Sequence, residues 1–351
     1  MNDLGYINTR VKSMQCHLFP RESVEEMVEL PDLGALADYL FNSPYQDELS
    51  VSMKGAEPRL GIEVALERQL AGCFNKILTM AGGGDRALFR RILGRGDIQV
   101  VKTILRGLNR NGAPEDIIPN VGTGVDLSAG QITELIEAAD VTAAVELLVS
   151  WRSPLGSLLH SLLPQYREKR QLASLELALD RDFYATLSKP HGLSFADAEI
   201  LQKLIATEVE VKNICRVLAT PGDRHEVELL QFGSRTSSLI GKLRETKSID
   251  EAIVVLSDSR YRRIVDKALP LIMMGSGSLV MLERFLDEVL IQESRLAALQ
   301  EPLSIAVIVH FARLKQNEVM NVGMICSGIA NQMPRNTIRA ALVFATQEAV
   351  A

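Results

Sequence analysis

Side chains that could carry catalysis or bind a metal ion are scattered along the 351 residues of this chain. No two histidines stand four residues apart, and neither HExxH nor GxSxG occurs, so the spacings typical of zinc proteases and serine hydrolases are missing. The cysteines form no CxxC, which argues against a zinc site and a disulfide framework. These residues are His17, His160, His191, His225, His310, Cys16, Cys73, Cys215 and Cys326. We therefore expect no catalytic residue, cofactor or metal ion, and we interpret His310, inside an apolar segment, as a packed core residue.

Phosphate-binding patterns are equally weak. GxxxxGK[ST] does not occur. Three glycines at 82–84 precede Arg86 and a helical pattern, and they could bind an anion at a helix N-terminus. Because no strand precedes these glycines, we interpret them as an interhelical turn. Basic residues cluster at 86–95, 167–170 and 260–267. Such clusters are either solvated helix faces or contacts for an acidic partner or lipid headgroups, and no interleaved aromatic residues favour nucleic-acid stacking.

Composition narrows the class of protein further. Lys and Arg number 38 against 44 Asp and Glu, a net charge of −6, which argues against a broad cationic surface for nucleic acid. Hydrophobic residues make up 47%, which excludes wholesale disorder.

The most apolar stretch, residues 268–282, is interrupted by Pro270 and is shorter than the roughly 20 residues of a bilayer span. No secretory signal is visible at the N-terminus. We expect a cytoplasmic chain without a transmembrane segment that could dock onto a membrane protein.

The local patterns predict helices throughout. Apolar residues recur at intervals of three and four, no long segment alternates with period two, and aromatic residues make up only 5%. Helix-start signals resembling a capping box occur at Ser23–Glu26, Ser128–Gln131, Ser194–Asp197 and Ser248–Glu251. The least ordered-looking stretch is the glycine-rich segment 109–130. The sequence therefore predicts an all-α fold.

Three landmarks recur in the same order with a period near 109 residues. An aromatic residue follows a short helical segment, a Leu–Glu pair opens a long helical pattern, and an acidic residue is followed three positions later by Val or Asn. The aromatic residues are Tyr45, Trp151 and Tyr261; the glutamates are Glu67, Glu176 and Glu283; the acids are Asp97, Glu210 and Glu318, followed by Val100, Asn213 and Asn321. We predict a threefold internal duplication with units at 1–125, 126–233 and 234–351.

A period of this length is too long for a stacked solenoid, so each unit would hold its own helical core. Three similar units suggest a pseudo-threefold body with two unlike faces and a central depression. An acid at i and Asn at i+3 share one helix face next to the apolar stripe, where polar groups need partners. Glu210 with Asn213 and Glu318 with Asn321 therefore either line the depression and bind a partner, or tie helices together within each unit.

Several segments resemble the C subunit of A/V-type rotary ATPases, the counterpart of the d subunit of the eukaryotic vacuolar proton pump. They are residues 6–14 (YINTRVKSM), 30–40, 43–45, 208–218, 302–322 (ending RLKQNEVMNV) and 334–342. The resemblance covers essentially the whole chain in order. Val100 departs from the Asn expected in the first copy, and the third motif is less charged than usual.

The resemblance implies a funnel-shaped, non-catalytic part of the central rotor on the cytoplasmic end of a membrane proteolipid ring. Its cavity would receive the foot of the central shaft, subunits D and F, and pass torque for proton or sodium transport. We expect interhelical turns at 82–85 and 275–277 to meet the ring. Two alternatives are an unrelated all-helical scaffold or adaptor, and a helical enzyme whose site residues converge only in three dimensions.

Overall fold

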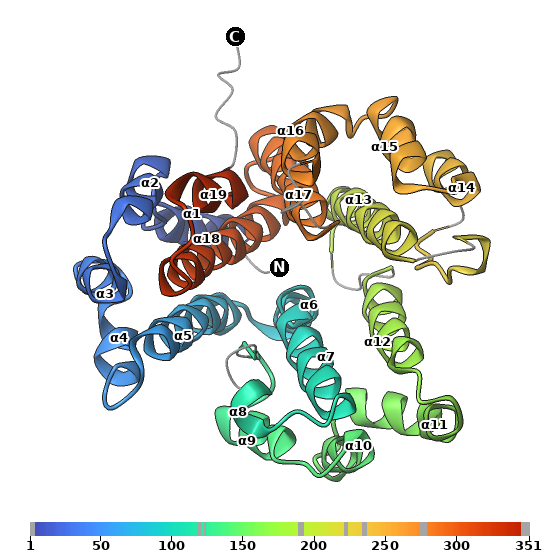
Figure 1. Cartoon of the computed structure of the whole chain (residues 1–351), viewed down its shortest axis with the longest axis horizontal. Helices are drawn as coiled ribbons and strands as arrows, with labels where there is room; N and C mark the ends of the chain where they lie inside the picture. Colours follow the sequence, from blue (N-terminus) through green and yellow to red (C-terminus); the bar gives the residue numbers. More distant parts are fainter. Residues whose placement is uncertain are drawn as a thin grey trace. The chain divides into compact units, whose positions relative to one another are not determined.

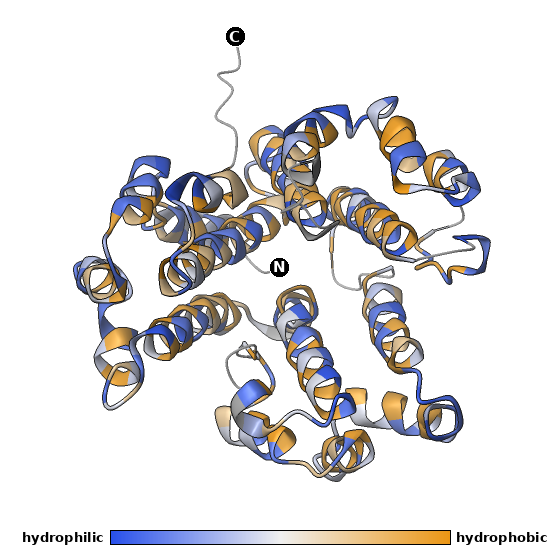
Figure 2. Cartoon of the chain, in the orientation of Figure 1, coloured by the Kyte–Doolittle hydropathy of each residue, from blue (hydrophilic) through white to orange (hydrophobic). Residues whose placement is uncertain are grey.

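The structure is a computed structural model, and it describes residues 4–117, 121–122, 124–188, 193–220, 224–233, 237–273 and 279–344. Every regular element within these ranges is a helix (Figure 1), so the expected all-α class is confirmed. Most of the helices carry both hydrophobic and hydrophilic residues (Figure 2), as amphipathic helices packed on one another do. The interhelical breaks expected at 189–192, 221–223 and 275–277 lie outside the described residues.

The chain divides into two compact units. Unit 1 comprises residues 30–192 and 329–331 with the first two residues, and unit 2 comprises 3–29, 193–328 and 332–351. Three sequence repeats and two compact units are different divisions of the chain, and the threefold division remains a prediction.

The helices of unit 1 are α3 (Leu33–Phe41), α4 (Gln46–Ser52), α5 (Pro58–Met80), α6 (Gly83–Leu93), α7 (Arg95–Asn109), α8 (Pro114–Ile117), α9 (Ala129–Ile136), α10 (Val141–Ser150), α11 (Pro154–Lys169) and α12 (Leu172–Leu187). In unit 1, α5 packs against α3, α4 and α6, while α7 packs against α12, α10 and α9.

The elements of unit 2 are α1 (Leu4–Gln15), α2 (Arg21–Glu29), α13 (Phe195–Ala219), the 3₁₀ helix η2 (Arg224–Glu226), α14 (Ser238–Glu245), α15 (Ile249–Ser257), α16 (Arg262–Met273), α17 (Leu279–Gln300), α18 (Ala306–Ala330) and α19 (Arg335–Ala341). Residues from α13 to α17 form one apolar core around Phe285, Tyr261 and Ile214, none of which is exposed. The first helices of the chain pack in this unit, where α2 contacts α19.

Helix starts repeat along the chain with a regular interval. Asp32, Asp140 and Ser248 are 108 residues apart, and each caps a helix of nine or ten residues with extended backbone and a side-chain oxygen that accepts the N–H three residues on. The short polar side chain satisfies a backbone donor that the first turn would otherwise leave free. Local geometry thus recurs at the period that the sequence landmarks suggest.

Two of the three aromatic landmarks have the same local surroundings. Tyr45 and Tyr261 lie three residues after the C-cap of α3 and α15, each backbone N–H is donated to the serine two residues before, and both side chains are buried. Trp151 is itself the C-cap of α10 and is partly exposed. The surroundings of Trp151 thus differ from those of the two tyrosines, and an interval of 108 residues from Tyr45 leads to Ser153 instead.

The expected helix starts are mostly confirmed. Ser128 and Gln131 form a complete capping box, and Ser194 and Ser248 accept the N–H of the residue three positions on. Ser23 does not start a helix, because α2 already begins at Arg21. The segment 109–130 is not simply a loop, since α8 forms within it.

Candidate functional site

Asp97 is a buried carboxylate that fixes the backbone ahead of α9. It lies in the first turn of α7, is 4% exposed, and accepts hydrogen bonds from the N–H groups of Val125, Asp126 and Leu127 at 3.1, 3.0 and 2.9 Å. Burial raises the pKa of Asp97 above its ordinary value, while the three N–H donors act in the opposite direction. Gly124 permits the close approach, because a Cβ there would lie 2.0 Å from Oδ1.

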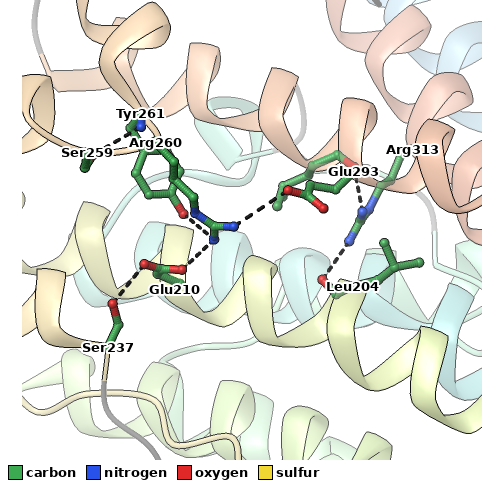
Figure 3. Close-up of polar contacts among 9 residues, drawn as sticks. Leu204, Glu210, Ser237, Ser259, Arg260, Tyr261, Glu293 and Arg313 are labelled. Atoms are coloured by element: carbon green, nitrogen blue, oxygen red, sulfur yellow. Dashed lines mark hydrogen bonds and ion pairs between the residues drawn. The ribbon is translucent and has the colours of Figure 1, made fainter.

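Glu210 has the same position in the second sequence copy and makes a similar contact. Its Oε1 accepts from the hydroxyl of Ser237, the N-cap of α14, at 3.0 Å. Its Oε2 accepts from Arg260 at 2.5 Å, and this guanidinium also lies 3.6 Å from Glu293 (Figure 3). Arg260 further donates to the hydroxyl of Tyr261 at 2.9 Å. Burial, followed by the negative charge of Glu210, raises the pKa of Tyr261, so this phenol stays protonated.

Glu318, the acid of the third copy, is also buried. Its side chain is 5% exposed and that of Lys315 is 2% exposed, and the two form an ion pair at 2.7 Å. The other carboxylate oxygen accepts the backbone N–H of Phe19 at 2.5 Å, two residues before α2 begins at Arg21. A buried charge requires both a counter-charge and hydrogen bonds, and Glu318 has both.

The three acids therefore make the same kind of contact at three places in the chain. Each lies on a long helix and binds the short segment directly ahead of another helix: α9 for Asp97, α14 for Glu210 and α2 for Glu318. A carboxylate suits this position because charge-assisted bonds to N–H and O–H donors are the strong ones. The contact joins elements inside one compact unit in each case.

The asparagines three positions on also bind backbone. Asn213 donates to the carbonyl of Leu230 at 2.9 Å and accepts its N–H at 2.8 Å. Asn321 makes the same pair with Val343, at 2.8 and 3.1 Å. A side-chain amide matches a backbone amide in this way because each offers one donor and one acceptor. Val100, in the first copy, is buried and apolar, and its side chain has no amide with which to form such a pair.

The glutamates of the Leu–Glu pairs have unlike surroundings. The preceding Leu66, Leu175 and Leu282 are all buried. Glu67 lies against Gly122, where a Cβ would come within 2.7 Å of its Oε2. Glu176 binds Arg106 with both oxygens at 2.6 Å. Glu283 lies close enough to Cys215 for its charge to add to the burial that raises the pKa of this thiol to about 12.

Buried cations are a feature that the sequence patterns did not predict. Arg313 donates to the carbonyl of Leu204 at 3.3 Å (Figure 3). It also donates to the carbonyl of Leu290 at 2.6 Å and pairs with Glu208 at 3.1 Å. Arg284, 5% exposed, donates to Asn321 at 2.9 Å and to Asn317. The available signal was their place on apolar helix faces, where a charged side chain needs a partner.

The basic clusters pair with acids of the same unit. Arg263 and Lys267 both face the buried Glu288, at 3.7 and 2.8 Å. Arg90 pairs with Asp126 at 2.9 Å across an exposed surface. Within the part of the chain that the structure describes, no group of three or more His, Cys, Asp or Glu side chains is placed to hold a metal ion. The polar groups gathered in this region of each unit thus hold helices in register.

Comparison with known proteins matches nearly the whole chain. Residues 7–341 fit the family described as ATP synthase (C/AC39) subunit. The C subunit of the A-type ATP synthase of Haloferax volcanii is 26% identical, covering 96% of this chain and 97% of the relative. The corresponding C subunits of Methanococcoides burtonii and Methanocaldococcus jannaschii are 26% and 22% identical, each over 97% of this chain and over 94% and 86% of the relatives.

These relatives are named as subunits of an A-type ATP synthase. Among the described residues of this chain, no helix is long and apolar enough to cross a bilayer. The match runs from α1 to the end of α19 and so includes nearly every tie described above. This chain belongs to the ATP synthase (C/AC39) subunit family.

Proposed function

We propose that this chain is the non-catalytic C subunit of the central rotor in an A/V-type ATPase. It would sit peripherally on the cytoplasmic side, between the shaft subunits D and F and the proteolipid ring, and pass torque between them. The observation that carries the proposal is the likeness to the C subunits of A-type ATP synthases over nearly the full length of both chains. The resemblance in residues 6–14 and 302–322 supports the same role.

The internal contacts are suited to carrying a mechanical load. Torque transmission requires that helices do not slide past one another, and close-packed cores resist compression and shear. Hydrogen bonds accepted by Asp97, Glu210 and Glu318 tie each long helix to the segment ahead of another helix. Such directional contacts fix the register of the helices, which apolar packing alone leaves less specified.

A bridging assay tests the proposal directly. Proteolipid rings in detergent are immobilised, and shaft subunits D and F are added with or without this chain. We expect the shaft to be retained only when the chain is present, and the chain alone to have no ATPase activity. An unrelated all-helical protein of similar size serves as the control. Failure of the folded chain to bind either the ring or the shaft would refute the proposal.

A further inference from the structure

The first 26 described residues of the chain pack in the same unit as α18 and α19, which lie almost 300 residues later. Residues 4–29 belong to unit 2, although the chain between 30 and 192 belongs to unit 1. In Figure 1, α2 (blue) lies beside α19 (dark red), and the two helices are in contact. We call residues 4–29 the N-terminal segment.

Polar contacts attach the N-terminal segment along its length. Asn8 donates to the carbonyl of Ser304 at 3.0 Å, and the N–H of Phe19 binds Glu318 at 2.5 Å. Further contacts join Arg21 to the ring of Phe344, at 4.8 Å, and Glu29 to Arg339. The apolar side of the segment is buried at Ile7, Val11, Val24, Met27 and Val28.

The tie at Glu318 differs from the other two in how far along the chain its partner lies. Asp97 and Glu210 bind segments 28 to 30 and 27 residues away, so the chain itself holds each partner nearby. Glu318 and Phe19 are 299 residues apart. Bringing a distant partner into contact costs more conformational entropy, because a much longer loop must be closed.

Neither helix of the segment is long enough to be stable by itself. They have 12 and 9 residues, and isolated helices shorter than about 12 to 15 residues are marginal in water. Their partners on α18 and α19 follow almost 300 residues later in the chain and are therefore synthesised long after the segment itself. The contacts of the segment with α18 and α19 therefore form only after these helices have been made.

We infer that the N-terminal segment is a closing strap of unit 2, latched by Glu318, which docks last during folding and opens first in the native protein. The ion pair of Lys315 with Glu318 makes the latch depend on the charge of the carboxylate. Neutralising the carboxylate weakens the bond to Phe19 and removes the negative charge that Glu318 places beside the buried ammonium of Lys315, which favours an open state that admits water. The closed state thus requires both the N-terminal segment and α18 to be present.

Hydrogen–deuterium exchange of the full-length protein, followed by mass spectrometry of peptides, tests this inference. Glu318→Gln weakens the latch, Met27→Ala weakens the apolar contact of the strap, and Glu210→Gln breaks the corresponding local tie as a matched control. We expect exchange in peptides from 4–29 to accelerate about tenfold or more in the first two variants, since a buried bond to a charged group or a core side chain is worth that much. Peptides from α13 to α17 should stay protected.

The control separates a strap from a merely destabilised unit. Glu210→Gln should leave exchange in 4–29 within about twofold of the wild type, because its partner Ser237 is not in the strap. The inference is overturned if Met27→Ala leaves the exchange of 4–29 unchanged, or if 4–29 loses protection only together with α13 to α17. Either result would show that the segment is not a separate opening unit.

Discussion

His310 is a neutral, buried imidazole on α18, and its protonation should weaken unit 2 in mild acid. The residue is 6% exposed, and its Nδ1 lies 3.2 Å from the hydroxyl of Ser294. Burial lowers the pKa of His310 from 6.5 to about 4, and the positive charges of Arg313 and Arg295 act in the same direction. The fold therefore favours the unprotonated ring, as the sequence-based interpretation of a core histidine expects.

The sign and size of the effect follow from the two pKa values. The unfolded chain binds this proton near pH 6.5 and the folded chain only near pH 4, so the stabilisation is complete above 6.5 and is lost as the pH falls towards 4. The difference corresponds to about 3 kcal/mol of unfolding free energy at pH 4. Carboxylates also titrate in this pH range, so the contribution of His310 must be measured as a difference between variants.

Urea denaturation followed by far-UV circular dichroism at pH 7, 6, 5 and 4 provides that difference. His310→Asn keeps a polar group near Ser294 but does not titrate. We expect the wild type to lose about 3 kcal/mol more than His310→Asn between pH 7 and 4, whereas the exposed His17→Asn should follow the wild type. Parallel curves for the wild type and His310→Asn would refute the reasoning.

Two further pairs of substitutions test the packing. Asn213→Ala and Asn321→Ala should each lower the unfolding free energy by about 1–3 kcal/mol, since each leaves a buried backbone amide without its partner; unchanged urea midpoints would contradict the proposed role of the amides. Gly156→Ala places a Cβ 2.5 Å from the backbone of Leu148 and should cost about 1–3 kcal/mol. Gly241→Ala meets nothing within 4 Å in α14 and should instead raise stability by about 0.5–1 kcal/mol. Equal thermal midpoints for these two glycine variants would count against the close contact of α10 with α11.

Helix starts could be predicted from the sequence because a cap is a local contact. Ser128, Ser194 and Ser248 each bind the backbone three residues ahead, so the pattern and its partner are visible together. Trp151 does not share the surroundings of Tyr45 and Tyr261, because an aromatic residue after a short helix carries no register of its own. The interval between helix caps gives the register directly.

The acids of the candidate site can be found by spacing, but their partners cannot. Asp97 binds loop backbone, and any residue type except proline can supply an N–H, so the sequence of 125–127 contains no signal for the contact. Gly124, which permits the approach, carries only the signal of a loop residue. Arg260 stands out as part of a basic cluster, but its bond to Glu210 links positions 50 residues apart and cannot be inferred from helical periodicity.

The composition of unit 2 has a practical consequence. Residues 4–29 and 193–328 belong to this unit, whereas the residues between them belong to unit 1. No single uninterrupted fragment that excludes unit 1 can therefore contain all of unit 2. A fragment that begins at residue 193 lacks both α1 and α2 and with them the buried side chains that these helices contribute.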